Sequence, residues 1–124
     1  MWKRWNPNPQ GLLTGDCTVR AICAATGKGW HEIHDQLCDL SGRMADMPSA
    51  DRVWWELLRR YGFTKQRLIS TCPDCYTVRD FARDHPVGTF VLGPHEHAVC
   101  VINGDWWDSW DSGSTVPTYF FRRR

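Results

Sequence analysis

The sequence predicts an α+β domain in which helices come first and an antiparallel β-sheet follows. Apolar residues recur at helical spacing through roughly the first half of the chain. From Gly88 onward, short runs rich in β-branched and aromatic residues replace that spacing. The length of 124 residues, with 42% hydrophobic and 23% charged, is typical of one folded domain. We therefore expect a single domain over 1–124, with 1–15 as an extended lead-in and 122–124 as a basic tail.

Three helices are expected in the first half of the chain. The first is predicted over residues 17–26, where Thr14 or Asp16 can cap its start and Gly27 its end. The second helix has an apolar face and is predicted to end near Gly42. The third also has an apolar face, with Ser49 as its N-cap and Gly62 at its end.

Short strands and one further helix are expected in the second half. Thr77 and Asp80 have capping-box spacing, so a short helix begins there and Pro86 stops it. Asn103-Gly104 is a strong signal for a two-residue hairpin turn. Strands are predicted at 66–70, 89–92, 98–102, 106–110 and 117–121, the last of them at an edge of the sheet.

Composition narrows the possible partners and locations. The charges nearly balance, 15 Lys+Arg against 14 Asp+Glu, so bulk electrostatics favours neither nucleic acid nor an acidic membrane surface. No apolar run approaches the roughly 20 residues that span a bilayer, and no apolar stretch follows the basic start of the chain as in a secretory signal. We therefore expect a cytoplasmic protein whose six cysteines are mostly free thiols.

Cys17 and His97 are candidates for a nucleophile and its base. Cys17 follows Gly15-Asp16 and opens the first predicted helix, so its sulfur lies near backbone N–H groups that stabilise a thiolate. His97 precedes the apolar run 98–102, and a buried strand there would hold its ring with one nitrogen free to accept a thiol proton. Either residue alone is more often structural; together they indicate nucleophilic catalysis.

The predicted hairpin supplies a third member. With Asn103-Gly104 as a two-residue turn, Asp108 becomes the diagonal neighbour of His97 across the strand pair. Its carboxylate can then orient the imidazole and stabilise the protonated ring. A three-residue turn would bring Asp111 opposite His97 instead, so Asp108 is expected and Asp111 is the alternative. Loss of the orienting carboxylate is expected to slow turnover strongly and to change folding little.

The order and context of these residues resemble the papain-like cysteine peptidase superfamily. That superfamily has the order Cys, His, Asn/Asp, and Asp108-Ser109-Trp110 is similar to the Asn-Ser-Trp triplet in which its third member commonly stands. A closer likeness is to small papain-fold proteins of bacteria and their phages. It covers most of residues 10 to 113 and is carried by Gly15–Ile22, Thr77–Ala82, His85–Thr89, His97–Val99 and Asp108–Ser112.

The resemblance implies a minimal papain-like fold and a thiol hydrolase, peptidase or isopeptidase-like, that forms an acyl-thioester on Cys17. It implies the triad Cys17, His97 and Asp108, with Gln10 in the oxyanion hole. It further implies a peptide or protein substrate, no cofactor, and a shallow cleft or one that a protein partner completes, in the cytosol of a bacterium or a phage-infected host. Two alternatives stay open: a papain-fold binding protein without catalysis, such as a phage factor that blocks a host protein, and a transglutaminase-like acyltransferase.

Several further signals are weighed beside the triad. His95 is the reserve candidate for the base, and Trp106 and Trp110 are expected to line the cleft. The Cys72-Pro73-Asp74-Cys75 segment could contribute to a zinc site, but no second CxxC accompanies it, so no metal is expected. The additional ligands of such a site would have to come from His31, His34 or Cys38.

Overall fold

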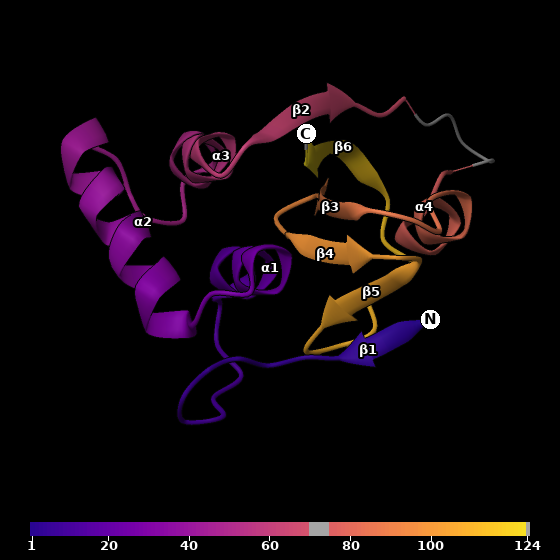
Figure 1. Ribbon diagram of the computed structural model, residues 1–124, viewed down its shortest axis with the longest axis horizontal. Helices are drawn as coiled ribbons and strands as arrows, with labels where there is room; N and C mark the ends of the chain where they lie inside the picture. The colour runs from indigo at the N-terminus through magenta and orange to yellow at the C-terminus, as the bar shows by residue number, and fades with distance from the viewer. Residues whose placement is uncertain (70–74, 124) are drawn as a thin grey trace.

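The computed structural model describes residues 1–69 and 75–123, which contain four helices and a six-stranded mixed sheet (Figure 1). The helices are α1 (Cys17–Thr26), α2 (Trp30–Met44), α3 (Asp51–Arg60) and α4 (Val78–Asp84). The strands, in their order across the sheet, are β1 (Trp2–Arg4), β5 (Asp105–Asp108), β4 (Val99–Ile102), β3 (Thr89–Pro94), β6 (Pro117–Arg123) and β2 (Phe63–Arg67). The predicted α+β class is confirmed.

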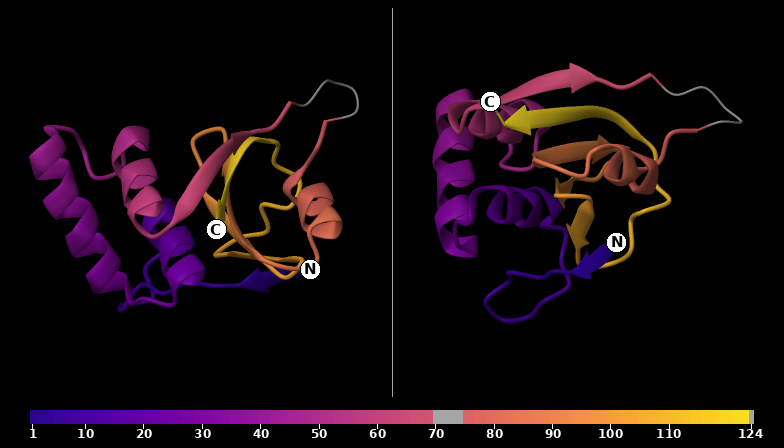
Figure 2. Two further views of the ribbon diagram at one scale, coloured as in Figure 1. Left: turned by 45° about the horizontal axis from the view of Figure 1, so that its top comes forward. Right: turned by 45° about the vertical axis from the view of Figure 1, so that its right-hand side comes forward.

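The sheet separates two hydrophobic cores. Helices α1, α2 and α3 lie on one side of the sheet and α4 lies on the other (Figure 2). Side chains alternate between the two faces of a strand, so neighbouring residues of β4 contribute to different cores: Cys100 joins the core under α1, and Val99 and Val101 join the core under α4. Most of the apolar residues of β3, β4 and β6 are therefore buried from one side or the other.

The first helix has the predicted bounds, and the reasons are visible at its two ends. Gly27 takes the left-handed conformation (φ 74°), and its N–H bonds the carbonyl of Cys23. Asp16 stands at the N-cap position, but its side chain makes no capping hydrogen bond, because its carboxylate turns to other partners described below. At α4 the predicted capping box between Thr77 and Asp80 is confirmed.

The β4–β5 hairpin has the predicted register. Asn103 (φ 49°) and Gly104 (φ 83°) form a two-residue turn with both residues in the left-handed region, as a type I′ turn requires. Ile102 consequently pairs with Asp105, and Val101 with Trp106. The strand therefore carries Asp108 to the end of the hairpin that is nearest to His97.

Other predicted boundaries are wrong. The lead-in contains β1, which pairs in parallel with β5, so the sheet is mixed and not purely antiparallel. The predicted edge strand, β6, lies inside the sheet between β3 and β2 and includes two residues of the expected basic tail, Arg122 and Arg123. Helix α3 has Ala50 and not Ser49 at its N-cap, and β2 begins at Phe63, whereas α2 ends at Met44, close to the predicted end near Gly42.

Parallel pairing of β1 depends on contacts far apart in sequence. The backbone N–H of Trp5 donates to the carbonyl of Asp108 (2.8 Å), and the indole of Trp2 donates to the same carbonyl (3.1 Å). The start of the chain is thereby attached to the end of β5.

Within the described ranges, no helix has the length and apolar character needed to cross a bilayer.

The packing over Gly93 gives a stability prediction. A Cβ at this position would lie 2.0 Å from a ring carbon of Tyr119, so Gly93→Ala must displace that ring. We expect Gly93→Ala to cost about 1–3 kcal/mol in the free energy of unfolding. The matched control is Gly42→Ala in α2, where a Cβ meets nothing within 4 Å, and it should stabilise by up to about 1 kcal/mol.

Chemical denaturation of the two variants measures both effects. A Gly93→Ala protein as stable as the wild type would show that the Tyr119 ring can move aside without cost, contrary to this packing.

Candidate active site

Cys17 is the first residue of α1, and its side chain is partly exposed. The first turn of a helix has backbone N–H groups without partners inside the helix, and these groups favour negative charge near them. The rest of α1 is anchored because most of its side chains, among them Ile22 and Cys23, are buried in the core. The sulfur therefore stands at a rigid helix start that faces solvent.

His97 follows a tight turn between β3 and β4. Its backbone N–H bonds the carbonyl of Pro94 (3.1 Å), and Glu96 adopts a positive φ of 51° to close the turn. The imidazole Nε2 lies 2.6 Å from Oδ2 of Asp108. An ionised carboxylate can only accept, so Nε2 carries the hydrogen and Nδ1 is the nitrogen left for Cys17.

Asp108 is buried and fully engaged. Its Oδ2 accepts from Nε2 of His97 and from the hydroxyl of Ser112 (2.6 Å), while its Oδ1 accepts from the backbone N–H of Ser109 (2.8 Å). Oδ1 also pairs with Nη2 of Arg20 (3.2 Å). Arg20 and the Ser109 backbone thus hold Oδ1, and Oδ2 is left to bind His97 and Ser112.

Arg20 links this carboxylate to the residue that precedes the nucleophile. Its Nη1 forms an ion pair with Oδ1 of Asp16, and Asp16 Oδ2 accepts from the indole N–H of Trp30 (2.9 Å). Both charged residues are buried, with 5% of Arg20 and 7% of Asp16 exposed. The guanidinium therefore bridges two carboxylates, one from the start of α1 and one from the end of β5.

The charge states of His97 and Asp108 follow from these contacts. Burial opposes the charged form of His97, but hydrogen bonding to Asp108 and to Cys17 outweighs it and raises the pKa of His97 to about 9. Burial likewise opposes ionisation of Asp108, but hydrogen bonds from His97 and Ser112 keep the pKa of that carboxyl below its usual value. At neutral pH the pair is an imidazolium and a carboxylate.

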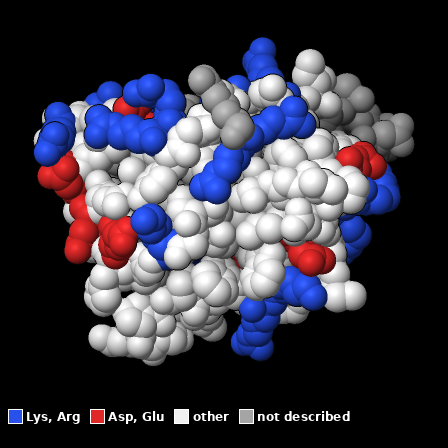
Figure 3. All heavy atoms as spheres, viewed as in Figure 1, with Lys and Arg blue, Asp and Glu red and all other residues white. Residues whose placement is uncertain are grey.

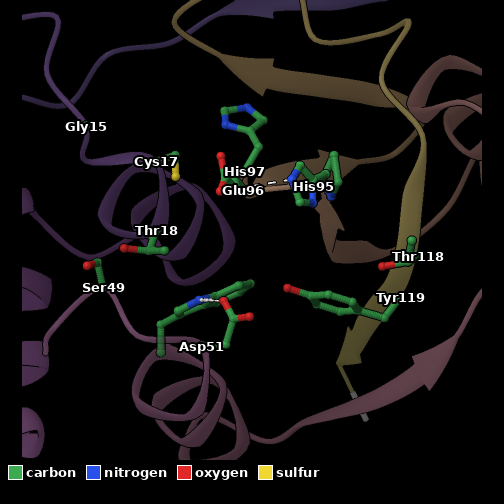
Figure 4. A pocket seen from close by; sticks show the side chains of 12 residues that line it. Gly15, Cys17, Thr18, Ser49, Asp51, His95, Glu96, His97, Thr118 and Tyr119 are labelled. Carbon is green, nitrogen blue, oxygen red and sulfur yellow. Dashed lines mark hydrogen bonds and ion pairs between the residues drawn. The ribbon is translucent and has the colours of Figure 1, made fainter. Parts of the chain in front are cut away.

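A cavity of about 530 Å³ opens beside these residues. Figure 4 shows the Cys17 side chain and the His97 ring on the same side of it, with the Tyr119 hydroxyl pointing in from β6. Burial is the main cause that raises the pKa of Tyr119 to about 12, so its hydroxyl stays protonated. The cavity lining contains both polar and apolar surface and is made up of Gly15, Cys17, Thr18, Ser49, Asp51, Trp54, Pro94, His95, Glu96, His97, Thr118 and Tyr119.

The structure separates the two carboxylates that sequence left as alternatives. Asp108 contacts His97, whereas Asp111 accepts hydrogen bonds from the indole of Trp106 (2.9 Å) and the backbone N–H of Gly113 (3.0 Å). The predicted contact between Asp108 and His97 is therefore confirmed as geometry, because the two-residue turn sets the register. Asp111 instead fastens the loop after β5.

The remaining candidates lie in different places. Gln10 is exposed in the loop before α1 and is not among the residues that line the cavity, so the structure does not support its expected role there. His95 stands at the mouth of the cavity, 93% exposed. Trp110 lies against the His97 ring, with 4.9 Å between ring centroids, but it is not among the residues that line the cavity, so its expected place in the cleft lining is not supported. Trp106 is buried in the core under α4, which corrects the expectation that it lines the cleft.

The cysteines of the described residues are not arranged as a metal centre. Cys17, Cys23, Cys38 and Cys100 are free thiols, and Cys75 is disulfide-bonded, so its sulfur is not available as a zinc ligand. Cys72 lies outside the described residues. In the described part of the chain, no three His, Cys, Asp or Glu side chains are grouped so that they could hold a metal ion.

Sequence reasoning missed two side chains of the site, Arg20 and Ser112. A weak signal for the first was available, because Asp16 and Arg20 are four residues apart on a predicted helix start. Nothing in that spacing indicates Asp108, 88 residues further along the chain. Ser112 lies in a loop whose path only the fold defines.

No family model matches the chain, and no match is found among curated proteins or solved structures. The fold and the residues of the site are therefore the basis for any statement about function.

The contact to His97 predicts different effects for the two aspartates. Asp108→Asn keeps the shape but removes the charge that orients the imidazole, so alkylation of Cys17 by iodoacetamide at pH 6 should slow at least about tenfold. Because Asp108 also pairs with the buried Arg20, its loss should lower stability as well, by about 3 kcal/mol, so we now expect a larger effect on folding than the sequence alone predicts.

Asp111→Asn is the matched control, and its alkylation rate should stay within about twofold of the wild type. Slow alkylation in Asp111→Asn together with a normal rate in Asp108→Asn would contradict the assignment.

The raised pKa of His97 also predicts how stability depends on pH. The folded-state pKa of about 9 exceeds the ordinary value of 6.5, so the protonated ring contributes stability below pH 6.5, and this contribution is lost as pH rises through 9. We expect the free energy of unfolding to fall by on the order of 1–3 kcal/mol between those pH values. His97→Gln should show a much smaller fall. Parallel curves for the two proteins in urea denaturation would contradict a charged His97.

Proposed function

We propose that this protein is a thiol hydrolase that cleaves an amide bond, peptide or isopeptide, through an acyl-thioester on Cys17. The observation that carries the proposal is the 2.6 Å contact between His97 Nε2 and Asp108, which leaves Nδ1 toward a cysteine at a helix start. The resemblance to papain-like peptidases, with the order Cys, His, Asp, is consistent with it. The open cavity beside Cys17 offers room for a substrate.

The chemistry needs two proton transfers at one nitrogen. The Cys17 thiolate attacks the amide carbon, forming a C–S bond and an oxyanion. When the oxyanion collapses, the C–N bond breaks and the amine takes the Nδ1 proton of His97. Water then attacks the thioester, His97 accepts one of its protons, and the C–S bond breaks to release the thiolate and a carboxylic acid, which loses its remaining proton to solvent. Asp108 holds the ring in one orientation through both transfers.

Stabilisation of the oxyanion is assigned to the helix start. The first-turn N–H groups of α1 lie next to Cys17 and have no partners inside the helix, so they can donate to negative charge on the substrate oxygen. This assignment replaces Gln10. The same N–H groups and the His97 imidazolium favour the Cys17 thiolate before attack.

The proposal predicts which cysteine reacts at mildly acidic pH. At pH 6, iodoacetamide should alkylate Cys17 at least about tenfold faster than any other free thiol, because its partly exposed sulfur stands at a helix start next to His97. Burial raises the pKa of Cys23 to about 12, burial likewise raises the pKa of Cys100, and Cys38 serves as the exposed reference thiol. Peptide mapping by mass spectrometry measures each rate.

Two variants control this experiment. Cys17→Ser should remove the fast reaction and leave the rates of the other cysteines unchanged, and His97→Gln should slow the reaction at Cys17 alone. If Cys38 reacts as fast as Cys17 in the wild type, the nucleophile assignment is wrong.

Product analysis separates hydrolysis from the other outcomes. After incubation with bacterial lysate, new peptide termini support hydrolysis. New cross-links indicate an acyltransferase, and a co-purifying partner without products indicates a binding protein, and either result overturns the proposal.

A further inference from the structure

Two carboxylates and one guanidinium are buried directly behind the proposed reacting pair. The guanidinium of Arg20 pairs with Asp16, which precedes Cys17, and with Asp108, which holds His97. All three are at least nine-tenths buried, so water screens their charges poorly. The charges of Asp16, Arg20 and Asp108 should therefore influence both Cys17 and His97.

The geometry points to Arg20 as a positioning residue that aligns Asp108 with His97 and balances the negative charge behind Cys17. This inference rests on the proposed function, because it concerns the same thiol and imidazole. Arg20 touches neither of those reacting groups in the contacts above, and it acts through the two carboxylates.

The alignment follows from how the oxygens of Asp108 are shared. Arg20 Nη2 and the backbone N–H of Ser109 occupy Oδ1, while His97 and Ser112 occupy Oδ2. A carboxylate held on one oxygen cannot rotate away from the imidazole at the other. The planar guanidinium is suited to this role because its separate N–H groups reach two carboxylates at once.

The charge balance follows from a count of the buried groups. Asp16 and Asp108 carry two negative charges, and a Cys17 thiolate adds a third, against the positive charges of Arg20 and the His97 imidazolium. Without Arg20 the group would hold a net charge of two negative units while Cys17 is ionised, which disfavours the thiolate. With Arg20 the excess is one unit.

Other titratable groups face Cys17 and His97 from the open side of the cavity. His95 and Glu96 belong to the turn before β4, Asp51 begins α3, and Tyr119 comes from β6. The first three are exposed, so solvent screens them, and the Tyr119 hydroxyl remains neutral because its pKa is about 12. The three buried charged residues behind Cys17 and His97 are consequently the main fixed charges that act on these two side chains.

The experiment measures the alkylation rate of Cys17 as a function of pH in variants that remove the charge of Arg20, of Asp16, or of both. Arg20→Met should raise the midpoint of that profile by about one pH unit, a roughly tenfold loss of rate below the midpoint. Asp16→Asn should lower the midpoint, because it removes one of the negative charges. The double variant should return to within about half a unit of the wild type, and Arg20→Lys should shift the midpoint less than Arg20→Met.

Midpoint shifts of opposite sign in Arg20→Met and Asp16→Asn would distinguish the proposed electrostatic role of Arg20 from a purely structural role. Loss of packing alone would lower the melting temperature and leave the midpoint in place, or move it in one direction for both variants. Arg43→Met is the matched control: Arg43 forms an exposed ion pair with Asp39 on α2, and its midpoint and rate should equal those of the wild type.

Each outcome bears on one claim. If Cys17 is not selectively reactive in the wild type, the proposed function fails. If it is selectively reactive but Arg20→Met and Asp16→Asn leave the midpoint unchanged or move it in the same direction, the inference about Arg20 fails and the proposed function stands. Should Arg20→Met not fold, Asp16→Asn and Arg20→Lys decide alone, and an unchanged midpoint in Asp16→Asn overturns the inference.

Discussion

The Asp108 carboxylate is only 1% exposed, and a buried charge is tolerated only where ion pairs and hydrogen bonds replace its hydration. Three segments that are far apart in the sequence meet this requirement: α1 through Arg20, the turn before β4 through His97, and the loop after β5 through Ser112. Its backbone carbonyl also receives hydrogen bonds from the N-terminal segment. The geometry of the site and the docking of β1 therefore depend on the same residue.

The position of the thiol depends on the sheet in a similar way. Helix α1 packs against the face of the sheet that carries Cys100. This contact fixes the start of the helix, and therefore Cys17, next to the His97 side chain of the turn before β4. Lys and Arg side chains gather along the upper part of the face shown in Figure 3, but the cavity lining itself contains neither Lys nor Arg. The site thus combines buried charged residues behind Cys17 and His97 with an open cavity in front of them.

How far the sequence predicts this arrangement depends on whether the deciding interactions are local. The hairpin register is predicted correctly because Asn103-Gly104 determines the turn by backbone conformation alone, and α1 and α4 are predicted because their ends have local signals. The strand β1 is missed because its three residues pair in parallel with a strand about a hundred positions away. Arg20 is missed for the same reason, since only the fold brings it to Asp108.

The proposed mechanism requires Cys17 to carry an acyl group during turnover. Rapid mixing with p-nitrophenyl acetate, followed by acid quench and intact mass measurement, tests it without knowledge of the natural substrate. We expect a burst of one p-nitrophenolate per protein and an added acetyl group that peptide mapping places on Cys17. The burst should be absent in Cys17→Ser and much slower in His97→Gln. A wild-type protein that shows no burst, or that carries the acetyl group on another cysteine, would contradict the account.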